Sequence, residues 1–162
     1  MVIRFCYSSG IMKFLSSLLF VCILFCASCV NAQVTTIQAM DFGNFISRNN
    51  NFQFAITLNP DGTFSFDSAG FFVISAPQQG IYDIFTSQVN ATIVSVDVQQ
   101  SEPLTAPGGA FTLSNFQAVH SGITDGAGIA RVMIGATART TGTGLPYPDQ
   151  TYDGSIDIEV NF

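Results

Sequence analysis

Apolar and polar residues alternate without a break through the last eight residues of the sequence. The apolar side of this alternation consists of Ile156, Ile158, Val160 and Phe162. The polar side consists of Ser155, Asp157, Glu159 and Asn161. Successive side chains of a β-strand point to opposite faces of a sheet, so the pattern predicts a strand that buries one face. We expect such a strand to pair, either within its own sheet or with a partner.

Similar patterns predict further strands after residue 32. Apolar residues alternate over 52–58, the turn-forming sequence Asn59-Pro60-Asp61-Gly62 comes next, and the alternation resumes over 64–66. Proline presets the backbone of the second turn residue, and aspartate and glycine tolerate the turn conformations after it, so residues 52–67 predict a β-hairpin. Residues 71–75 form a continuous apolar run, which is typical of a strand buried on both faces.

The remaining segments divide into strands and loops in the same way. Strands are expected over 34–42, 81–86, 91–98 and 110–120, and the terminal strand from Tyr152 or Ser155 to Phe162. After Asp125-Gly126, another strand places one apolar set on a shared face: Ala130, Val132, Ile134, Ala136 and Ala138. Polar loops are expected over 99–109, where Pro103 and Pro107 oppose regular pairing, and over 140–148. The predicted fold class is therefore all-β, an antiparallel sandwich or barrel of roughly seven to nine strands.

The first 32 residues have the composition of a leader. Lys13 precedes a mostly apolar stretch over 14–30, and small residues ending at Ala32 occupy the positions that a signal peptidase reads. We expect an N-terminal extension and signal peptide over 1–32, a single domain over 33–162, and export. All four cysteines precede residue 30, so the domain itself has no thiols. Cys29 ends a sequence similar to a bacterial lipobox; lipidation there, or an uncleaved anchor, is an alternative to cleavage after Ala32.

The expected domain is strongly acidic. The chain has 5 Lys and Arg residues, 11 Asp and Glu residues and a net charge of −6. Because two basic residues lie in the leader, residues 33–162 retain only Arg48, Arg131 and Arg139 against all 11 acids. Nucleic acids and anionic lipid headgroups are bound by clustered Lys and Arg. We expect no nucleic-acid partner, and membrane association only through a lipid at Cys29.

Four short motifs carry a resemblance to a known family. They are Met40-Asp41-Phe42-Gly43, Asn59-Pro60-Asp61-Gly62-Thr63, Phe111-Thr112-Leu113-Ser114-Asn115-Phe116, and Thr151-Tyr152-Asp153-Gly154 before the terminal strand. Over nearly all of residues 33–162 the chain resembles the bacterial family called domain of unknown function 4402, with Phe162 where that family is expected to have tyrosine. The resemblance implies an immunoglobulin-like or pilin-like β-sandwich, exported to the periplasm, cell surface or medium of a bacterium. It implies no established activity and supplies no functional residues.

Few side chains of the sequence suit catalysis. His120 is the only histidine; Ser114 and Ser121 are near it in sequence, but no Gly-x-Ser-x-Gly turn that would activate a serine is present. Asp157 and Glu159 share one face of the terminal strand, roughly 6.5–7 Å apart. That face is expected to meet solvent, where carboxylates protect a strand edge against aggregation. We predict no catalytic and no cofactor-binding residues.

Three aspartates recur at every fourth position near the end of the sequence: Asp149, Asp153 and Asp157. Calcium takes six to eight oxygen ligands, and these carboxylates are candidates to supply some of them. The sequence lacks the aspartate density of a calcium loop, and aspartates are common in the turns of β-proteins. We predict no metal-binding residues and keep calcium at these aspartates as an alternative.

The sequence favours a non-enzymatic structural or adhesive protein that is secreted or attached to the cell surface. A protein partner or a second copy would pair with the terminal strand, whose backbone would supply affinity and whose alternate side chains would supply specificity. We expect the apolar face of this strand to belong to the core of its own domain. The alternative is an extracellular ligand-binding module, with glycans as candidate ligands, that uses the loops 99–109 and 140–150 with Tyr147 stacking on a sugar.

Overall fold

The computed structural model describes residues 33–162, and the predicted leader with Cys29 lies outside the described residues. Ten strands follow one another along residues 33–162. They are β1 (Gln33–Gln38), β2 (Phe45–Ser47), β3 (Ala55–Leu58), β4 (Phe64–Phe66), β5 (Phe71–Val73), β6 (Gly80–Phe85), β7 (Ser95–Ala106), β8 (Gly109–His120), β9 (Ile129–Arg139) and β10 (Asp153–Asn161).

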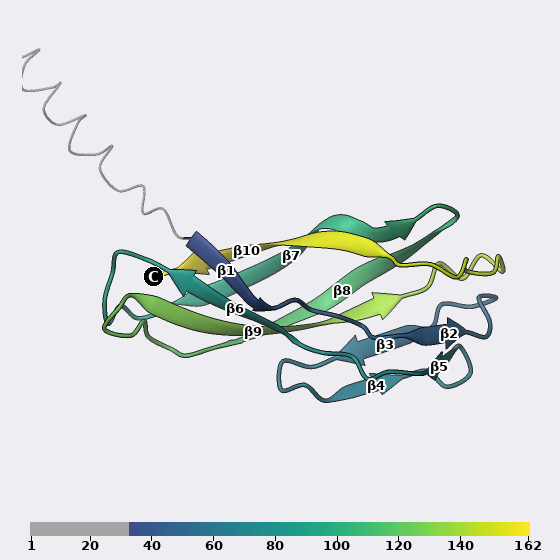
Figure 1. The fold of residues 1–162 in the computed structure, drawn as a ribbon, viewed down its shortest axis with the longest axis horizontal. Helices are drawn as coiled ribbons and strands as arrows, with labels where there is room; N and C mark the ends of the chain where they lie inside the picture. The colour runs from purple at the N-terminus through teal and green to yellow at the C-terminus, as the bar shows by residue number, and fades with distance from the viewer. Residues whose placement is uncertain (1–32) are drawn as a thin grey trace, which may run out of the picture. The chain divides into compact units, whose positions relative to one another are not determined.

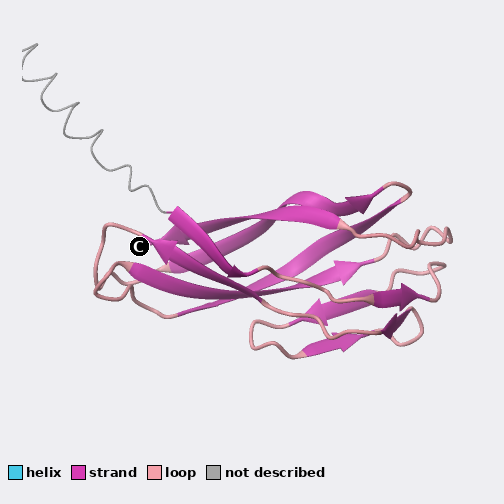
Figure 2. Cartoon of the chain, in the orientation of Figure 1, coloured by secondary structure: helices cyan, strands magenta, loops and turns pink. Residues whose placement is uncertain are grey.

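Eight of these strands belong to one large antiparallel sheet, and β2 pairs with β5 in a small second sheet. The main path of the large sheet runs β1-β6-β9-β8-β7-β10, and it curls so that β7 and β10 lie across from β6 and β9 (Figure 1). The described residues consist of strands and loops without a helix (Figure 2). The predicted all-β, antiparallel, sandwich-like fold is confirmed. The structure has ten strands rather than the expected seven to nine, and β2, with 3 residues, is too short to show alternation.

Strand β9 is the centre of the large sheet. One of its edges pairs with β6 along the first half and with β3 along the second half, while its other edge pairs with β8. The predicted apolar face of β9 is confirmed, because all five of its residues are buried: Ala130, Val132, Ile134, Ala136 and Ala138. Neighbours on both edges and a layer above this face together exclude water from it.

The interior consists of two hydrophobic clusters, one along each half of β9. The aliphatic cluster contains Tyr82, Ile84, Ile93, Ala130, Val132 and Ile134. The aromatic cluster contains Phe42, Ile56, Leu58, Phe71, Phe111, Leu113, Ala136 and Ala138. Met40, Phe116 and Ile156 pack against both clusters, so the two are continuous.

The predicted hairpin turn over residues 59–62 is confirmed. The amide of Gly62 donates to the carbonyl oxygen of Asn59 at 3.0 Å, and Gly62 has φ 83°, a region that favours glycine. The side chain of Asp61 accepts hydrogen bonds from the hydroxyl and the amide of Thr63 at 2.6 and 2.9 Å. These bonds stabilise the charged carboxylate and lower the pKa of Asp61.

The expected loop over 99–109 is wrong, because β7 continues as a strand to Ala106. The register between β10 and β7 shifts between Asp153 and Ser155, opposite Pro103. A proline costs little at such a bulge because the ladder of hydrogen bonds is already interrupted there. Gly154 allows the close approach, since a Cβ on it would lie 2.8 Å from the carbonyl oxygen of Glu102 and 2.9 Å from that of Pro103.

The expectation that residues 71–75 are buried on both faces is also wrong for this domain. Phe71 is buried in the aromatic cluster, whereas Phe72 and Ile74 are exposed. Within residues 33–162, strand β5 has only β2 beside it and no layer over its outer face. Elsewhere the boundaries shift by a few residues: β3 begins at Ala55, so Phe52 lies outside the hairpin strands and is exposed.

Candidate functional site

The long edge strand β10 is the main candidate for a functional surface. Along one edge it pairs with β7, and beyond the bulge the register is regular from Ile156 opposite Gln100 to Asn161 opposite Ser95. The other edge of β10 has no hydrogen-bonded strand among residues 33–162, because β10 ends the sheet path. A free edge of this length presents unpaired backbone groups, which can pair with an added strand.

The apolar face of β10 packs on the interior of its own domain. Ile156, Ile158, Val160 and Phe162 all contact the aliphatic cluster, as the alternation predicts. None of the four is fully buried, however; all are half-buried. The absence of a neighbour on the free edge, among the residues that the structure describes, explains this partial burial, since a missing strand leaves one side of each side chain open to water.

The outer face of β10 is acidic. Asp157 and Glu159 are exposed, and Glu159 lies directly opposite Asp97 of β7. Asn161 partly screens this pair, donating to the Ser95 hydroxyl at 3.0 Å and lying 3.5 Å from an Asp97 oxygen. Asp157 and Glu159 therefore lie on an open strand face as expected, and this face opposes the approach of another acidic strand.

Strand β1 is the opposite end of the same sheet path. Among residues 33–162 it pairs with β6 along one edge only, and its side chains are exposed apart from Gln38, which is half-buried. Residues 33–38 carry no charged side chain. The two free ends of the sheet therefore differ: β10 is long and acidic, and β1 is short and neutral.

The structure places His120 at the end of β8, half-buried, where its Nδ1 accepts a hydrogen bond from the Gly122 amide at 3.2 Å. The Ser121 hydroxyl donates to the carbonyl oxygen of Ile123 at 2.8 Å, and that of Ser114 donates to the carbonyl oxygen of Thr137 at 3.5 Å. The two serines are thus engaged with backbone groups and not with the imidazole. The structure does not bring these three residues together as a catalytic set.

The three aspartates considered for calcium do not share one site. Asp149 lies in the loop before β10, and Asp153 and Asp157 lie four residues apart on β10, roughly 13 Å along a strand. All three are exposed. Within residues 33–162, no group of three or more His, Cys, Asp or Glu side chains is placed to hold a metal ion.

Tyr147, which the sequence suggests as a sugar-stacking residue, packs inside its own domain. Its ring stacks on Phe111 with centroids 4.3 Å apart, and Tyr152 meets both rings edge-on. The Tyr147 hydroxyl donates to the carbonyl oxygen of Ala110 at 2.8 Å. One face of the ring is therefore covered, and the residue ties the loop after β9 to the start of β8. Burial also raises the pKa of Tyr152.

Two polar interactions in the structure could not be predicted from the sequence pattern. Asp83 and Arg131 form a two-point ion pair across β6 and β9, with distances of 2.8 Å (Nε–Oδ1) and 2.9 Å (Nη2–Oδ2). The hydrogen bonds from Arg131 lower the pKa of Asp83. Asn50 is buried and donates to the carbonyl oxygen of Leu145 at 2.8 Å while accepting from the Gly142 amide at 2.9 Å. Partners 48 and more than 90 residues apart in sequence leave no local signal.

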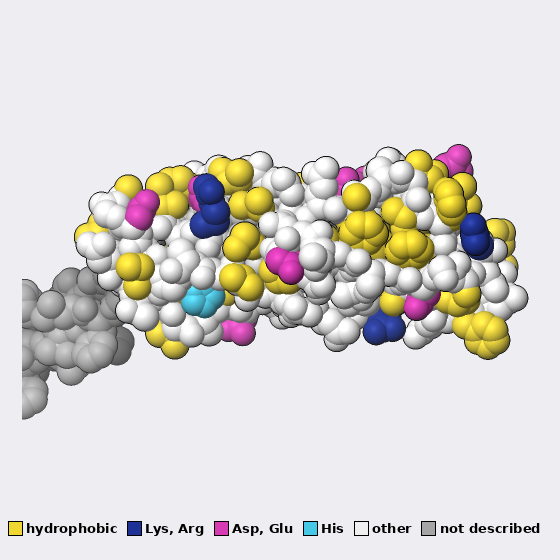
Figure 3. All heavy atoms as spheres, turned by 90° about the horizontal axis from the view of Figure 1, so that it is seen from below, with side chains coloured by type: hydrophobic (Ala, Val, Ile, Leu, Met, Phe, Trp, Pro, Cys, Tyr) yellow, Lys and Arg dark blue, Asp and Glu magenta, His cyan; other side chains and the backbone are white. Residues whose placement is uncertain are grey.

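A second surface candidate is the aromatic face, which we define as Ile46, Phe64, Phe66, Phe72 and Ile74. All five side chains are exposed. Hydrophobic side chains gather over the half of the molecule that carries β4 and β5 (Figure 3). The Arg48 guanidinium lies over the Phe72 ring, 5.3 Å from its centroid, and so places a positive charge beside this face.

No family model, curated protein or solved structure matches this chain. The resemblance to domain of unknown function 4402 therefore stays a prediction. Within residues 33–162, no helix has the length and apolar character needed to cross a membrane.

Proposed function

We propose that the protein is a non-enzymatic structural or adhesive subunit, exported from a bacterial cell, that assembles by strand addition at the free edge of β10. The observation that carries this proposal is the long unpaired edge of β10 above a half-buried apolar face. An added strand would satisfy the backbone groups and remove the remaining apolar surface from water. The leader composition and the family resemblance support export.

The charges on β10 narrow the choice of partner strand. In a two-fold antiparallel pairing of β10 with another β10, Asp157 and Glu159 would lie near the same residues of the second copy. Like charges directly opposite each other destabilise a strand pair. The neutral strand β1 carries no such penalty, and its outer edge is free as well among residues 33–162. Pairing of β10 with β1 of the next copy would continue the sheet from one molecule to the next and produce an open chain.

The proposal is tested by covering the β10 edge without altering the native residues. The chain is extended after Phe162 by an Asn-Gly turn and about six alternating Val and Thr residues, which are designed to fold back as a hairpin on β10. The matched control carries a Gly-Ser extension of the same length, which cannot form a strand. Light scattering after size exclusion then measures the mass of each exported protein over a range of concentrations.

We expect the unmodified protein and the Gly-Ser control to form concentration-dependent assemblies that the hairpin extension shortens or removes. Equal assembly of all three proteins would show that the β10 edge is not the contact. A protein that stays monomeric at every concentration would overturn the subunit proposal. Hydrogen exchange on β10 in dilute, monomeric samples provides the structural check, because in the monomer only the hairpin extension protects the outer amides of this strand.

A further inference from the structure

The small sheet of β2 and β5 is apolar on both of its faces. On the inner face, Phe45 meets Phe71 and Phe111 edge-on, with centroids 5.1 and 5.6 Å apart. On the outer face, Ile46 lies directly opposite Phe72 in the register. These two side chains are 53% and 49% exposed, and Ile74, which comes directly after β5, is 63% exposed. A sheet with this composition is typical of one that is covered on both sides.

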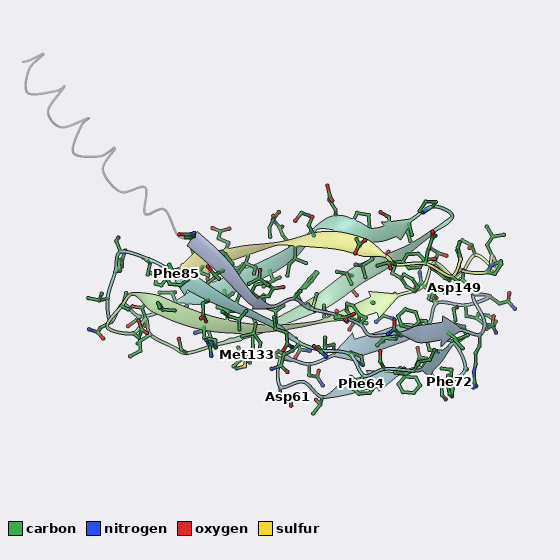
Figure 4. The ribbon with its side chains drawn as sticks, viewed as in Figure 1. Asp61, Phe64, Phe72, Phe85, Met133 and Asp149 are labelled. Carbon is green, nitrogen blue, oxygen red and sulfur yellow. The ribbon has the colours of Figure 1, made fainter. Side chains whose placement is uncertain are left out.

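Strand β4 extends the exposed apolar surface. Phe64 and Phe66 are 37% and 39% exposed, and their rings are nearly parallel, 19° apart in plane with centroids separated by 6.3 Å. Figure 4 shows Phe64 and Phe72 along the lower side of the view, on β4 and β5. The five residues of the aromatic face thus lie on β2, β4 and β5 and directly after β5, and all five are exposed.

The size of the aromatic face matches a protein–protein contact. With roughly 200 Å² for each large side chain, the exposed fractions of its five residues leave on the order of 500 Å² of apolar surface. A standard interface buries about 800 Å² on each partner, of which about 60% is apolar. The apolar share of such an interface is therefore close to the area that the aromatic face provides.

We infer that the aromatic face binds the same face of a second copy of this chain in a two-fold dimer. Two copies would pack their small sheets face to face, so that Ile46, Phe72 and Ile74 of each acquire the missing second layer. The sequence pattern of residues 71–75, which predicts burial on both faces, would then hold for the dimer. This contact goes beyond the proposed strand addition, because it uses another surface and buries side chains instead of backbone edges.

The charge of the domain gives this contact a recognisable salt dependence. Residues 33–162 carry three arginines and eleven acidic residues, so two copies repel each other at long range. Arg48 offsets this repulsion only locally, beside Phe72. Because salt screens charge repulsion and does not weaken apolar burial, we expect the dimer to become tighter as the salt concentration rises.

The test uses the exported protein with the hairpin extension on β10, in which strand addition is blocked. Phe72→Ser and Ile46→Ser each remove one large apolar side chain of the aromatic face; the two residues lie opposite each other on β5 and β2. Phe85→Ser is the control, since Phe85 is an exposed phenylalanine as well, at 37%, but lies at the opposite end of the domain (Figure 4). Sedimentation at low and high salt gives the dimer dissociation constant, and circular dichroism confirms that each variant is folded.

We expect the edge-blocked protein to be a dimer, and the dissociation constant to rise about thirtyfold with Phe72→Ser, as for a central contact residue. Ile46→Ser should act in the same direction, and Phe85→Ser should leave the constant unchanged. A monomer at all concentrations and salt levels would overturn the inference and assign the face to a different partner. An effect of Phe85→Ser equal to that of Phe72→Ser would also overturn it. Neither result affects the strand-addition proposal, because that proposal is tested by comparing the assembly of proteins with a free β10 edge and of the protein with the hairpin extension.

Discussion

Strands β9 and β10 have the same alternating sequence pattern and different places in the fold. Each places a row of aliphatic residues toward the interior, yet the row on β9 is buried while the row on β10 is only half-buried. β9 has neighbours on both edges, whereas β10 has a neighbour on one. Alternation therefore identifies which face of a strand is apolar, and the number of neighbouring strands decides how completely that face is buried.

The outer faces of β9 and β10 also differ, in the charges that lie opposite each other. On β9, Arg131 lies opposite Asp83 of β6, so the facing charges attract each other. On β10, Glu159 lies opposite Asp97 of β7, so the facing charges repel. The central strand pair is thus stabilised on both faces, while the terminal pair accepts a small loss on its outer face. Such a loss is consistent with an edge strand whose charges oppose pairing with β10 of a second copy.

Truncation of one residue on each strand would test the difference in burial most strongly. We expect Ile134→Ala on β9 to lower the free energy of unfolding by about 2–5 kcal/mol, because it removes fully buried methylene and methyl groups and leaves a cavity. Ile158→Ala on β10 should cost roughly 1–2 kcal/mol, since part of that side chain is already in water. Urea unfolding followed by circular dichroism measures both. Equal losses would contradict the distinction between centre and edge.

A charge at the end of β10 would show whether its apolar face serves the domain or a partner. Phe162 packs against the aliphatic cluster while remaining half-buried. We expect Phe162→Asp to destabilise the isolated domain by about 2 kcal/mol, less than for a fully buried aromatic ring. Thermal unfolding under conditions that keep the protein monomeric measures this. An unchanged midpoint with loss of assembly alone would mean that Phe162 serves a partner.

Removal of the Arg131 guanidinium tests the attractive pair on β9. Asp83 would lose its partner while its side chain remains only 12% exposed, so Arg131→Met should lower the stability of the domain; the loss should be modest because the Arg131 side chain is 57% exposed. Arg131 lowers the pKa of Asp83 from the ordinary value of 3.8. The stabilisation is therefore complete above that value and is lost as the pH falls through the lower pKa of the folded protein.

Urea unfolding at low salt, at neutral pH and in a series down to about pH 2, would measure this dependence. The difference between the native protein and Arg131→Met should shrink toward the acid end, with Asp83→Asn as the control that removes the titrating group. A difference that stays constant at every pH would show that Arg131 contributes by packing and not through its charge.

The smallest effect is expected on the outer face of β10. Glu159→Gln removes one of two facing carboxylates and should stabilise the domain by a few tenths of a kcal/mol. Salt screens this exposed repulsion, so the gain should decrease in high salt. Paired chemical unfolding curves at low and high salt measure it. A loss of stability with this change would show that Glu159 makes a favourable contact instead.

Local patterns in the sequence predict the strands that are long or end in a marked turn. The face of β9, the turn at Asn59-Pro60-Asp61-Gly62 and the terminal strand follow from periodicity and turn chemistry, which depend on neighbouring residues. Strand β2 is too short for such a pattern. The extension of β7 through Pro103 depends on a bulge opposite Gly154, and the Asp83–Arg131 pair depends on the register between strands distant in sequence.

The all-β class, the apolar faces and the acidic surface of the domain follow from the sequence alone, because composition and alternation act within each strand. Which strand is central and which is an edge depends on how the strands pair in the folded domain. The tertiary structure also decides that the aromatic face remains uncovered and that Tyr147 packs against Phe111. These properties depend on which segments meet after the chain folds, and burial is shared among neighbours. The two surfaces proposed for assembly are the places where the domain lacks such a neighbour.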